Sequence, residues 1–299
     1  MGATTLSRRI VESLPWLDEI GEAIQPRVQY AVTAGGKTLR DVLDGKYLEA
    51  PFHPMLSDVP LGSWTATTVC DGIDAATDSR AARNAADATL IIGNAGAVAA
   101  AVTGLSDWRY LSGGSRKMGV AHGLLNSVGL AFNVSSLLLR ATGRRKAGRL
   151  AFLAGFSIAG TAAHLGGELS YNYGLRVNRN VFEWAGPDEF TPVLDADELP
   201  PDGMRKVSLN GAHVLLSRLS NDNICAISSV CSHFAGPLEE GEREGDTVVC
   251  PWHESRFDLC TGQVLRGPAT FPQSRWDVRV RDGKIEIRGA AENIQKVVR

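Results

Sequence analysis

The sequence is poor in several features that would define a simple class of protein. Cysteine is scarce, with 5 in 299 residues, which excludes a disulfide-stapled scaffold. Histidine is nearly as scarce, with 6. No charge of one sign dominates, because 31 basic residues meet 33 acidic ones, so nothing in the overall charge suggests nucleic-acid binding. Against these absences stand 44% hydrophobic residues, which exclude a disordered chain and allow a sizeable core.

The hydrophobic residues are concentrated in the middle of the chain, which predicts a transmembrane domain over residues 49–173. Four spans are expected, at about 58–78, 85–106, 118–139 and 149–172. Each of the last three contains a long run without Asp, Glu, Lys or Arg, and approaches the roughly 20 residues that cross a bilayer. The first span holds Asp71 and Asp74, which must face a partner or water. The competing interpretation is a soluble bundle of apolar helices.

Residues 1–48 form a polar segment before this domain. Apolar residues recur at three- and four-residue steps from Leu6 to Ile24, which predicts an amphipathic helix that Pro26 interrupts. We expect it to lie on the membrane or on its own protein. Ser7-Arg8-Arg9 is not expected to start an export leader, because acidic residues occupy the stretch where an uncharged region would lie.

After a predicted linker over 174–188, apolar residues recur at every second position. Short alternating segments separated by Asn-Gly, Asp-Gly and Pro-Asp-Gly turns predict a small all-β domain over 189–290, followed by a tail over 291–299. The fold class is therefore a multidomain membrane protein, with an α-helical transmembrane bundle of four spans before the β-domain. We find no internal repeat in the sequence.

The strongest chemical signal is a pair of Cys/His motifs in the β-domain. Cys231-Ser-His233 is followed, after sixteen residues, by Cys250-Pro-Trp-His253. Two loops brought together would present two thiolates and two imidazoles. A mononuclear zinc site could use the same four ligands, so the ligand set alone does not identify the metal.

The residues around these ligands resemble the Rieske family across about 189–290. The resemblance lies in Cys231-Ser-His-Phe-Ala-Gly-Pro-Leu, Cys250-Pro-Trp-His, Phe257-Asp258, Gly262 and Gly267-Pro268-Ala269. It implies a [2Fe-2S] cluster in which Cys231 and Cys250 bind one iron and His233 and His253 bind the other, solvent-facing one. It also implies that the loop with Gly267 and Pro268 covers the cluster.

Three departures from the family pattern bear on the redox potential. High-potential relatives brace the two loops with a disulfide, and the positions of its cysteines are here Gly236 and Trp252, which indicates the low-potential ferredoxin or oxygenase type. The remaining Cys225 and Cys260 are expected to pack in strands. Glu254 follows His253 where relatives usually have Gly, and its carboxylate should favour the oxidised cluster.

Three of the six histidines fall in or beside the predicted bundle. Because successive spans alternate in direction, His53, His122 and His164 are expected on one side of the membrane, the side from which the β-domain emerges. Three interpretations remain open for them: polar packing residues, ligands of a haem b that exchanges electrons with the cluster, or a quinone pocket.

Residues 48–173 resemble an uncharacterised four-helix bacterial membrane domain family that is sometimes joined to Rieske domains. The resemblance lies in the stretch from Ala50 to Trp64. Relatives often have a paired His-Pro-x-His-Pro, whereas this chain keeps His53-Pro54 and has Ala50 at the earlier histidine. The family supplies no activity.

These features predict a protein of the bacterial inner or cell membrane that carries single electrons. The expected partners are the membrane and a redox protein, either reductase or acceptor, or the quinone pool, and no nucleic acid. An oxygenase would need a mononuclear iron in an added domain, so no substrate-oxidation site of its own is expected. The alternatives are a membrane-tethered redox sensor and the electron-transfer component of an oxygenase system.

Lys and Arg counts near the predicted spans do not decide the orientation, since seven fall on each side. A cytoplasmic β-domain is expected, because iron-sulfur clusters are assembled in the cytoplasm and we find no export leader.

Overall fold

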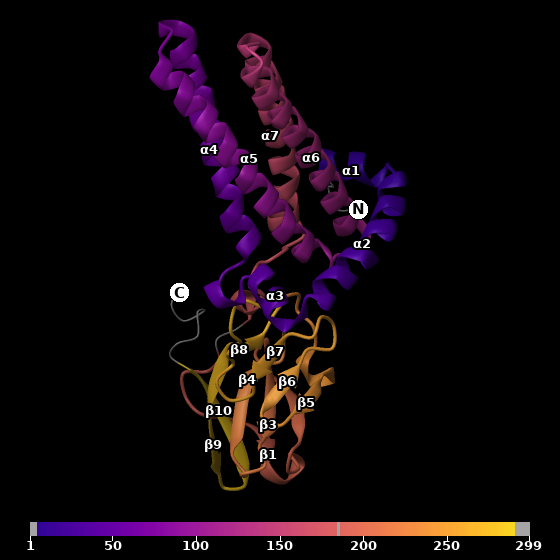
Figure 1. Ribbon diagram of the computed structural model, residues 1–299. Coiled ribbons are helices and arrows are strands. Elements are labelled where there is room, and N and C mark those ends of the chain that lie inside the picture. Colours follow the sequence, from indigo (N-terminus) through magenta and orange to yellow (C-terminus); the bar gives the residue numbers. More distant parts are fainter. Residues whose placement is uncertain (1–4, 184–185, 291–299) are drawn as a thin grey trace. The chain divides into compact units, whose positions relative to one another are not determined.

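A computed structural model describes residues 5–183 and 186–290 of the protein (Figure 1). The chain divides into two compact units. Unit 1 comprises Met1–Leu39 and Phe52–Leu175, and unit 2 comprises Arg40–Pro51 and Arg176–Arg299. The division places a short N-terminal segment in the same unit as the C-terminal β-domain.

Unit 1 is helical and consists mainly of two long helical hairpins, α4 beside α5 and α6 beside α7 (Figure 1). Its elements are α1 (Leu6–Glu12), α2 (Trp16–Ala34), α4 (Phe52–Thr77), α5 (Arg80–Trp108), α6 (Gly113–Ala141), α7 (Arg145–Gly167) and η2 (Glu168–Asn172), while α3 (Gly36–Leu43) runs from unit 1 into unit 2. Glycines allow the close approach within each hairpin. A Cβ on Gly93 would lie 2.5 Å from the ring of Trp64 on α4, and a Cβ on Gly155 would lie 2.7 Å from the Gly129 carbonyl on α6.

Three helices of the described chain are long and apolar enough to cross a membrane. They are Arg80–Trp108, Gly113–Ala141 and Arg145–Asn172, which overlap the last three predicted spans. The first predicted span corresponds to α4, which does not reach the same hydropathy. A four-span arrangement therefore stays a prediction.

The acidic residues of α4 have the partners that the sequence required. Asp71 accepts a 2.9 Å hydrogen bond from Arg140 on α6, and Asp74 accepts one of 2.9 Å from Arg145 on α7. Arg83 at the start of α5 also donates to Asp74, at 3.0 Å. These ion pairs join the two hairpins at one end of unit 1 and compensate charges that would be costly in an apolar surrounding.

The prediction that Pro26 interrupts the N-terminal helix is wrong. Helix α2 continues through Pro26 to Ala34. Pro26 and Glu22, whose carbonyl loses its helical donor, are both exposed, so water can replace the missing hydrogen bond.

Unit 2 contains two antiparallel sheets. The six-stranded sheet has the order β1-β10-β9-β4-β3-β2 and the four-stranded sheet the order β5-β6-β7-β8. The strands are β1 (Thr191–Asp195), β2 (Met204–Leu209), β3 (Ala212–Arg218), β4 (Ile224–Ser228), β5 (Glu242–Glu244), β6 (Thr247–Val249), β7 (Arg256–Asp258), β8 (Val264–Arg266), β9 (Arg275–Arg281) and β10 (Lys284–Gly289).

Each face of the larger sheet packs against its own hydrophobic core. Leu215 of β3 packs in a core with Val248 and Phe257 of the smaller sheet. Its neighbours Val214 and Leu216 belong to a second core with Ile285 of β10. Both sides of β3 are therefore buried, as its short apolar run allows.

The linker predicted over 174–188 is not a free spacer. The Arg179 N–H donates to the Ser232 carbonyl at 3.1 Å, and the Arg176 guanidinium donates to the Pro268 carbonyl at 2.6 Å. The polar residues that suggested a linker are instead hydrogen-bonding groups that fix this segment to the loops of unit 2. Segment Arg40–Pro51, predicted to fall partly in the N-terminal segment (1–48) and partly in the transmembrane domain (49–173), also belongs to unit 2.

Candidate metal centre

The first Cys/His motif lies in a tight loop after β4. The Cys231 N–H donates to the Gly236 carbonyl at 2.9 Å, and the Ala235 N–H donates back to the Cys231 carbonyl at 2.8 Å. Ala235 has a φ of 62°, the left-handed conformation that closes the loop. Gly236 is required by space, since a Cβ there would lie 2.8 Å from the Cys250 sulfur.

The second motif, between β6 and β7, is built in the same way. The Cys250 N–H donates to the Ser255 carbonyl at 2.8 Å, and the Glu254 N–H donates to the Cys250 carbonyl at 3.0 Å. Glu254 has a φ of 61°, matching the residue at the same position of the first loop. The two loops therefore present one thiol and one imidazole each with the same backbone geometry.

The four predicted ligand side chains converge as two pairs. Both thiols are buried, and burial raises the pKa of Cys231 well above its usual range. A hydrogen bond from the Cys231 thiol lowers the pKa of Cys250 to about 7. The rings of His233 and His253 have centres 5.2 Å apart and planes at 84°.

The distance between the two imidazole centres is that of two ligands on the same metal ion. Two imidazoles on one tetrahedral ion have centres about 5.1 Å apart, given metal–nitrogen bonds of about 2.0–2.1 Å. Within the described residues, however, no three His, Cys, Asp or Glu side chains meet around one point. A mononuclear zinc site needs such a meeting, whereas a diiron cluster needs only two ligands for each iron.

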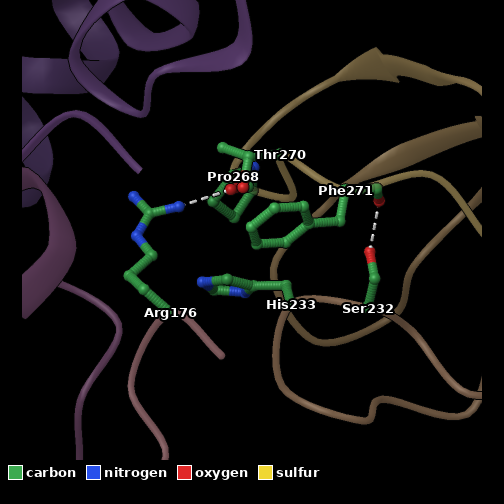
Figure 2. Close-up of a pocket in the computed structure, with 6 residues that line it drawn as sticks. All are labelled: Arg176, Ser232, His233, Pro268, Thr270 and Phe271. Atoms are coloured by element: carbon green, nitrogen blue, oxygen red, sulfur yellow. Dashed lines mark hydrogen bonds between the residues drawn. The ribbon is translucent and has the colours of Figure 1, made fainter. Parts of the chain in front are cut away.

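The loop after β8 covers the imidazole of the first motif. Figure 2 shows the His233 ring beside the Phe271 side chain, in a small pocket also lined by Arg176, Pro268 and Thr270. The Ser232 hydroxyl donates to the Phe271 carbonyl at 2.7 Å. His233 is buried, so this loop limits the access of solvent to that ligand.

Segment Arg40–Pro51 fixes the same loop from the opposite end of the sequence. The Asp41 carboxylate accepts a 3.2 Å hydrogen bond from the Gly267 N–H. The Asp44 carboxylate pairs with Arg176 at 3.2 Å, and Arg176 in turn donates to the Pro268 carbonyl. We name Asp41, Asp44 and Arg176 the loop clamp. Nothing in the local sequence of residues 40–51 indicated this role.

Two other predicted residues lie at the edge of the centre. The Glu254 carboxylate is exposed and lies 3.8 Å from Arg40 and 3.6 Å from Arg266. Two guanidinium groups therefore offset much of its charge, which weakens the electrostatic effect expected from the sequence. Trp252 is largely exposed, with its ring centre 6.4 Å from that of His253.

Cys225 and Cys260 pack in the core as expected, but their bond to each other was not predicted from the sequence. They form a disulfide with a Cα–Cα distance of 4.8 Å, between β4 and the turn that follows β7. Counting could have suggested it, because these are the two cysteines of the β-domain outside the ligand motifs. The bond joins the two sheets rather than the two ligand loops.

The three histidines of unit 1 do not form one group. His53 at the start of α4 and His122 on α6 lie together, with ring centres 6.3 Å apart. His164 on α7 is exposed and is not in ring contact with either. A site that uses all three histidines is therefore not formed.

Comparisons with known proteins support both halves of the sequence analysis. The Rieske [2Fe-2S] domain family matches residues 189–280, and a predicted membrane protein family (DUF2231) matches residues 49–179. Ferredoxin CarAc of Metapseudomonas resinovorans is 32% identical over 97 residues, which cover 32% of this chain and 91% of the relative. The ferredoxin component of the p-cumate 2,3-dioxygenase system of Pseudomonas putida is 30% identical, covering 36% of this chain and 92% of the relative.

One solved structure is also similar over part of the chain. The ferredoxin of carbazole 1,9a-dioxygenase from Nocardioides aromaticivorans IC177 is 29% identical, with a TM-score of 0.32, and the match covers 34% of this chain and 98% of that one.

Proposed function

Because the chain belongs to the Rieske [2Fe-2S] family through its β-domain and joins it to a predicted membrane domain, we propose that it is a membrane-anchored, ferredoxin-like carrier of single electrons. We propose that Cys231 and Cys250 hold one iron of the cluster and that His233 and His253 hold the other. The cluster, when bound, accepts and donates one electron at a time. The observation that carries the proposal is the convergence of the ligands as two pairs.

The chain's own residues prepare the site for the cluster. The two matched loops hold side by side two thiols that are 19 positions apart in the sequence. The loop with Gly267 and Pro268 shields His233. The positions at which high-potential relatives carry the two cysteines of a bracing disulfide are here Gly236 and Trp252, so that disulfide cannot form. These features support the low-potential type, since a bracing disulfide marks the high-potential relatives.

The relatives suggest the class of partner. Ferredoxin components of dioxygenase systems pass electrons between proteins, so we propose a redox protein, either reductase or acceptor, as the partner of this chain. A role as the electron-transfer component of an oxygenase system is the specific form of this proposal that the relatives' names favour. We assign residues 49–173 to the membrane anchor and 189–290 to the cluster domain.

We propose that the cluster domain lies on the oxidising side of the membrane, opposite to the cytoplasmic placement expected from the sequence. The Cys225–Cys260 disulfide favours this side, because disulfides persist mainly outside the reducing cytosol. The connection between α6 and α7, from Arg140 to Arg149, would then face the cytoplasm, and its basic residues agree with the positive-inside rule.

A second redox group in the membrane, haem or quinone, is the remaining part of the proposal. It would link the cluster to electron flow in the membrane. The contact between His53 and His122 is the observation that supports it.

The test of the cluster is spectroscopic. Full-length protein purified anaerobically in detergent and reduced should give the low-average-g electron paramagnetic resonance signal of a cluster with mixed His and Cys ligands, with two irons per chain. His253→Cys should keep iron but change the signal, since it removes one of the two nitrogen ligands. Stoichiometric zinc in place of iron would end the proposal.

A further inference from the structure

His53 and His122 come from different hairpins of unit 1 and meet in nearly perpendicular orientation. Their ring centres are 6.3 Å apart and their planes are at 88°. Two imidazoles that bind one metal ion from opposite sides have centres about 6.3 Å apart, given metal–nitrogen bonds of about 2.0–2.1 Å. The separation is therefore that of two axial ligands, and it is wider than the 5.2 Å between His233 and His253.

Each ring is held in the tautomer that binds metal. The Nδ1 of His53 lies 2.8 Å from the Ala100 carbonyl, and the Nδ1 of His122 lies 2.8 Å from the Ala162 carbonyl. A carbonyl oxygen can only accept, so both Nδ1 atoms carry the proton and both Nε2 atoms carry a lone pair. A backbone carbonyl that fixes one ring nitrogen is the usual support of a metal-binding histidine.

Asn126 is consistent with this assignment. Its amide nitrogen lies 3.2 Å from the His122 Nε2, as expected for a donor to a lone pair. The same amide also donates to the His122 carbonyl at 3.1 Å, so it keeps a partner if a metal takes the Nε2 lone pair.

His53 and His122 occupy equivalent positions in their hairpins. A Cβ on Gly104, four residues after Ala100, would lie 2.9 Å from the His53 ring. A Cβ on Gly166, four residues after Ala162, would lie 3.1 Å from the His122 ring. In both hairpins the imidazole therefore hydrogen-bonds one carbonyl of the facing helix and packs on the glycine one turn later.

The equivalence extends to the other end of the helices. Asp71 and Arg140, which form an ion pair, each stand 18 positions after the histidine of their own hairpin. The two hairpins therefore share the same contacts, although their sequences show no repeat. Two equivalent supports on facing hairpins are what a ligand bound between the hairpins requires.

From this geometry we propose that His53 and His122 are the two axial ligands of a haem b in unit 1. The porphyrin supplies four nitrogens, so two protein ligands complete the iron. A bare zinc or copper ion needs three or four protein ligands, and within the described residues no group of three candidate ligands occurs. The proposal rests on the proposed electron-carrier function for the role of the haem, which would exchange single electrons with the cluster.

The test uses full-length protein purified in detergent from haem-replete cells. We expect one low-spin haem b per chain by absorbance and pyridine haemochrome assay. His53→Ala and His122→Ala should each remove most of the Soret absorbance, whereas His164→Ala, at the exposed histidine of the same unit, should leave it unchanged. His122→Met should shift the spectrum and raise the haem potential rather than abolish binding, because Met/His ligation has that effect.

Each outcome decides the matter. Haem-free protein that does not take up added haemin, with an intact cluster signal, overturns the haem and leaves the carrier standing. A bound quinone lost in His53→Ala also overturns it. A haem that survives both alanine substitutions shows that other residues hold it. Haem without a cluster signal would instead remove the proposed function and keep this site.

Discussion

Asp44 and Arg176 form an ion pair 3.2 Å long whose side chains are only 1% and 4% exposed. The two residues are 132 positions apart, and the same guanidinium donates to the Pro268 carbonyl of the loop that covers His233. An ion pair this deeply buried adds little net stability, because removing both charges from water costs about as much as their attraction returns. Removal of one partner is nevertheless costly, since it leaves the other charge buried without compensation. Because Arg176 also binds the loop over the cluster site, loss of the ion pair should disturb this loop before the rest of unit 2.

The first prediction concerns this clamp. Asp44→Ala should lower the free energy of unfolding of unit 2 by about 3–5 kcal/mol, because Arg176 stays buried without its carboxylate. It should also speed the loss of the cluster's visible absorbance in the presence of an iron chelator. Denaturant unfolding and the bleaching rate measure the two effects.

The control for the clamp is the exposed ion pair of Asp195 with Lys284, also in unit 2. Asp195→Ala should leave both the stability and the bleaching rate nearly unchanged, because solvent screens an exposed pair. Equal bleaching rates for the two variants would show that the clamp does not protect the cluster.

Glu254 allows backbone and charge effects to be separated. Its φ of 61° favours glycine, so Glu254→Gly should stabilise unit 2 by about 1 kcal/mol, whereas Glu254→Gln should not. Both variants remove the carboxylate and should raise the midpoint potential by the same amount. Because the side chain is 67% exposed and faces Arg40 and Arg266, we expect only roughly 10–40 mV, which corresponds to about 0.2–1 kcal/mol for one electron.

The measurements are redox titration followed by electron paramagnetic resonance and thermal unfolding. A larger potential change in Glu254→Gly than in Glu254→Gln would assign the effect to loop geometry. A fall in potential in both variants would contradict the electrostatic account.

The ligand motifs and most strands of the β-domain could be predicted because their signals are local. The Cys-x-His and Cys-x-x-His motifs and alternating strands such as β9 and β10 can each be recognised from a few residues. Strands β5, β7 and β8 were not predicted, since each has three residues and carries charged side chains, whereas the equally short but apolar β6 was predicted.

Contacts between distant segments had no such signal. Asp41 bonds to Gly267 across 226 positions, and no pattern within residues 40–51 points to a partner so far along the sequence. The helices of unit 1 were predicted from composition, but composition does not say which histidines meet. That His53 joins His122 rather than His164 follows from the packing of one hairpin on the other.

The disulfide gives a prediction about the side of the membrane. In protein extracted from cells under an alkylating agent, Cys225 and Cys260 should react only after reduction, because a domain on the oxidising side keeps them bonded. Cys225→Ser with Cys260→Ser should lower the free energy of unfolding by about 2–4 kcal/mol.

The orientation itself is tested on intact spheroplasts. A protease site inserted at the Asp282-Gly283 turn between β9 and β10 should be cut from outside the cell, while one at the Gly143 turn between α6 and α7 should be protected. Cleavage of the second site alone, with free thiols at Cys225 and Cys260, would place the cluster domain in the cytoplasm.

The ion pair between Asp71 and Arg140 should hold the two hairpins of unit 1 together. Its side chains are 9% and 2% exposed, and Arg140 keeps a second carboxylate partner in Asp87 at 3.0 Å, so Asp71→Asn should destabilise unit 1 by about 1–3 kcal/mol. A double variant, Asp71→Leu with Arg140→Leu, should recover most of that loss, because it removes one charge of each sign and leaves Asp87 paired with Arg145 and Asp74 paired with Arg149. Glu12→Gln at the exposed pair with Arg8 serves as the control and should have little effect. Unfolding of the purified protein in detergent measures all three, and a double variant less stable than Asp71→Asn would show that the pair contributes more than it costs to bury.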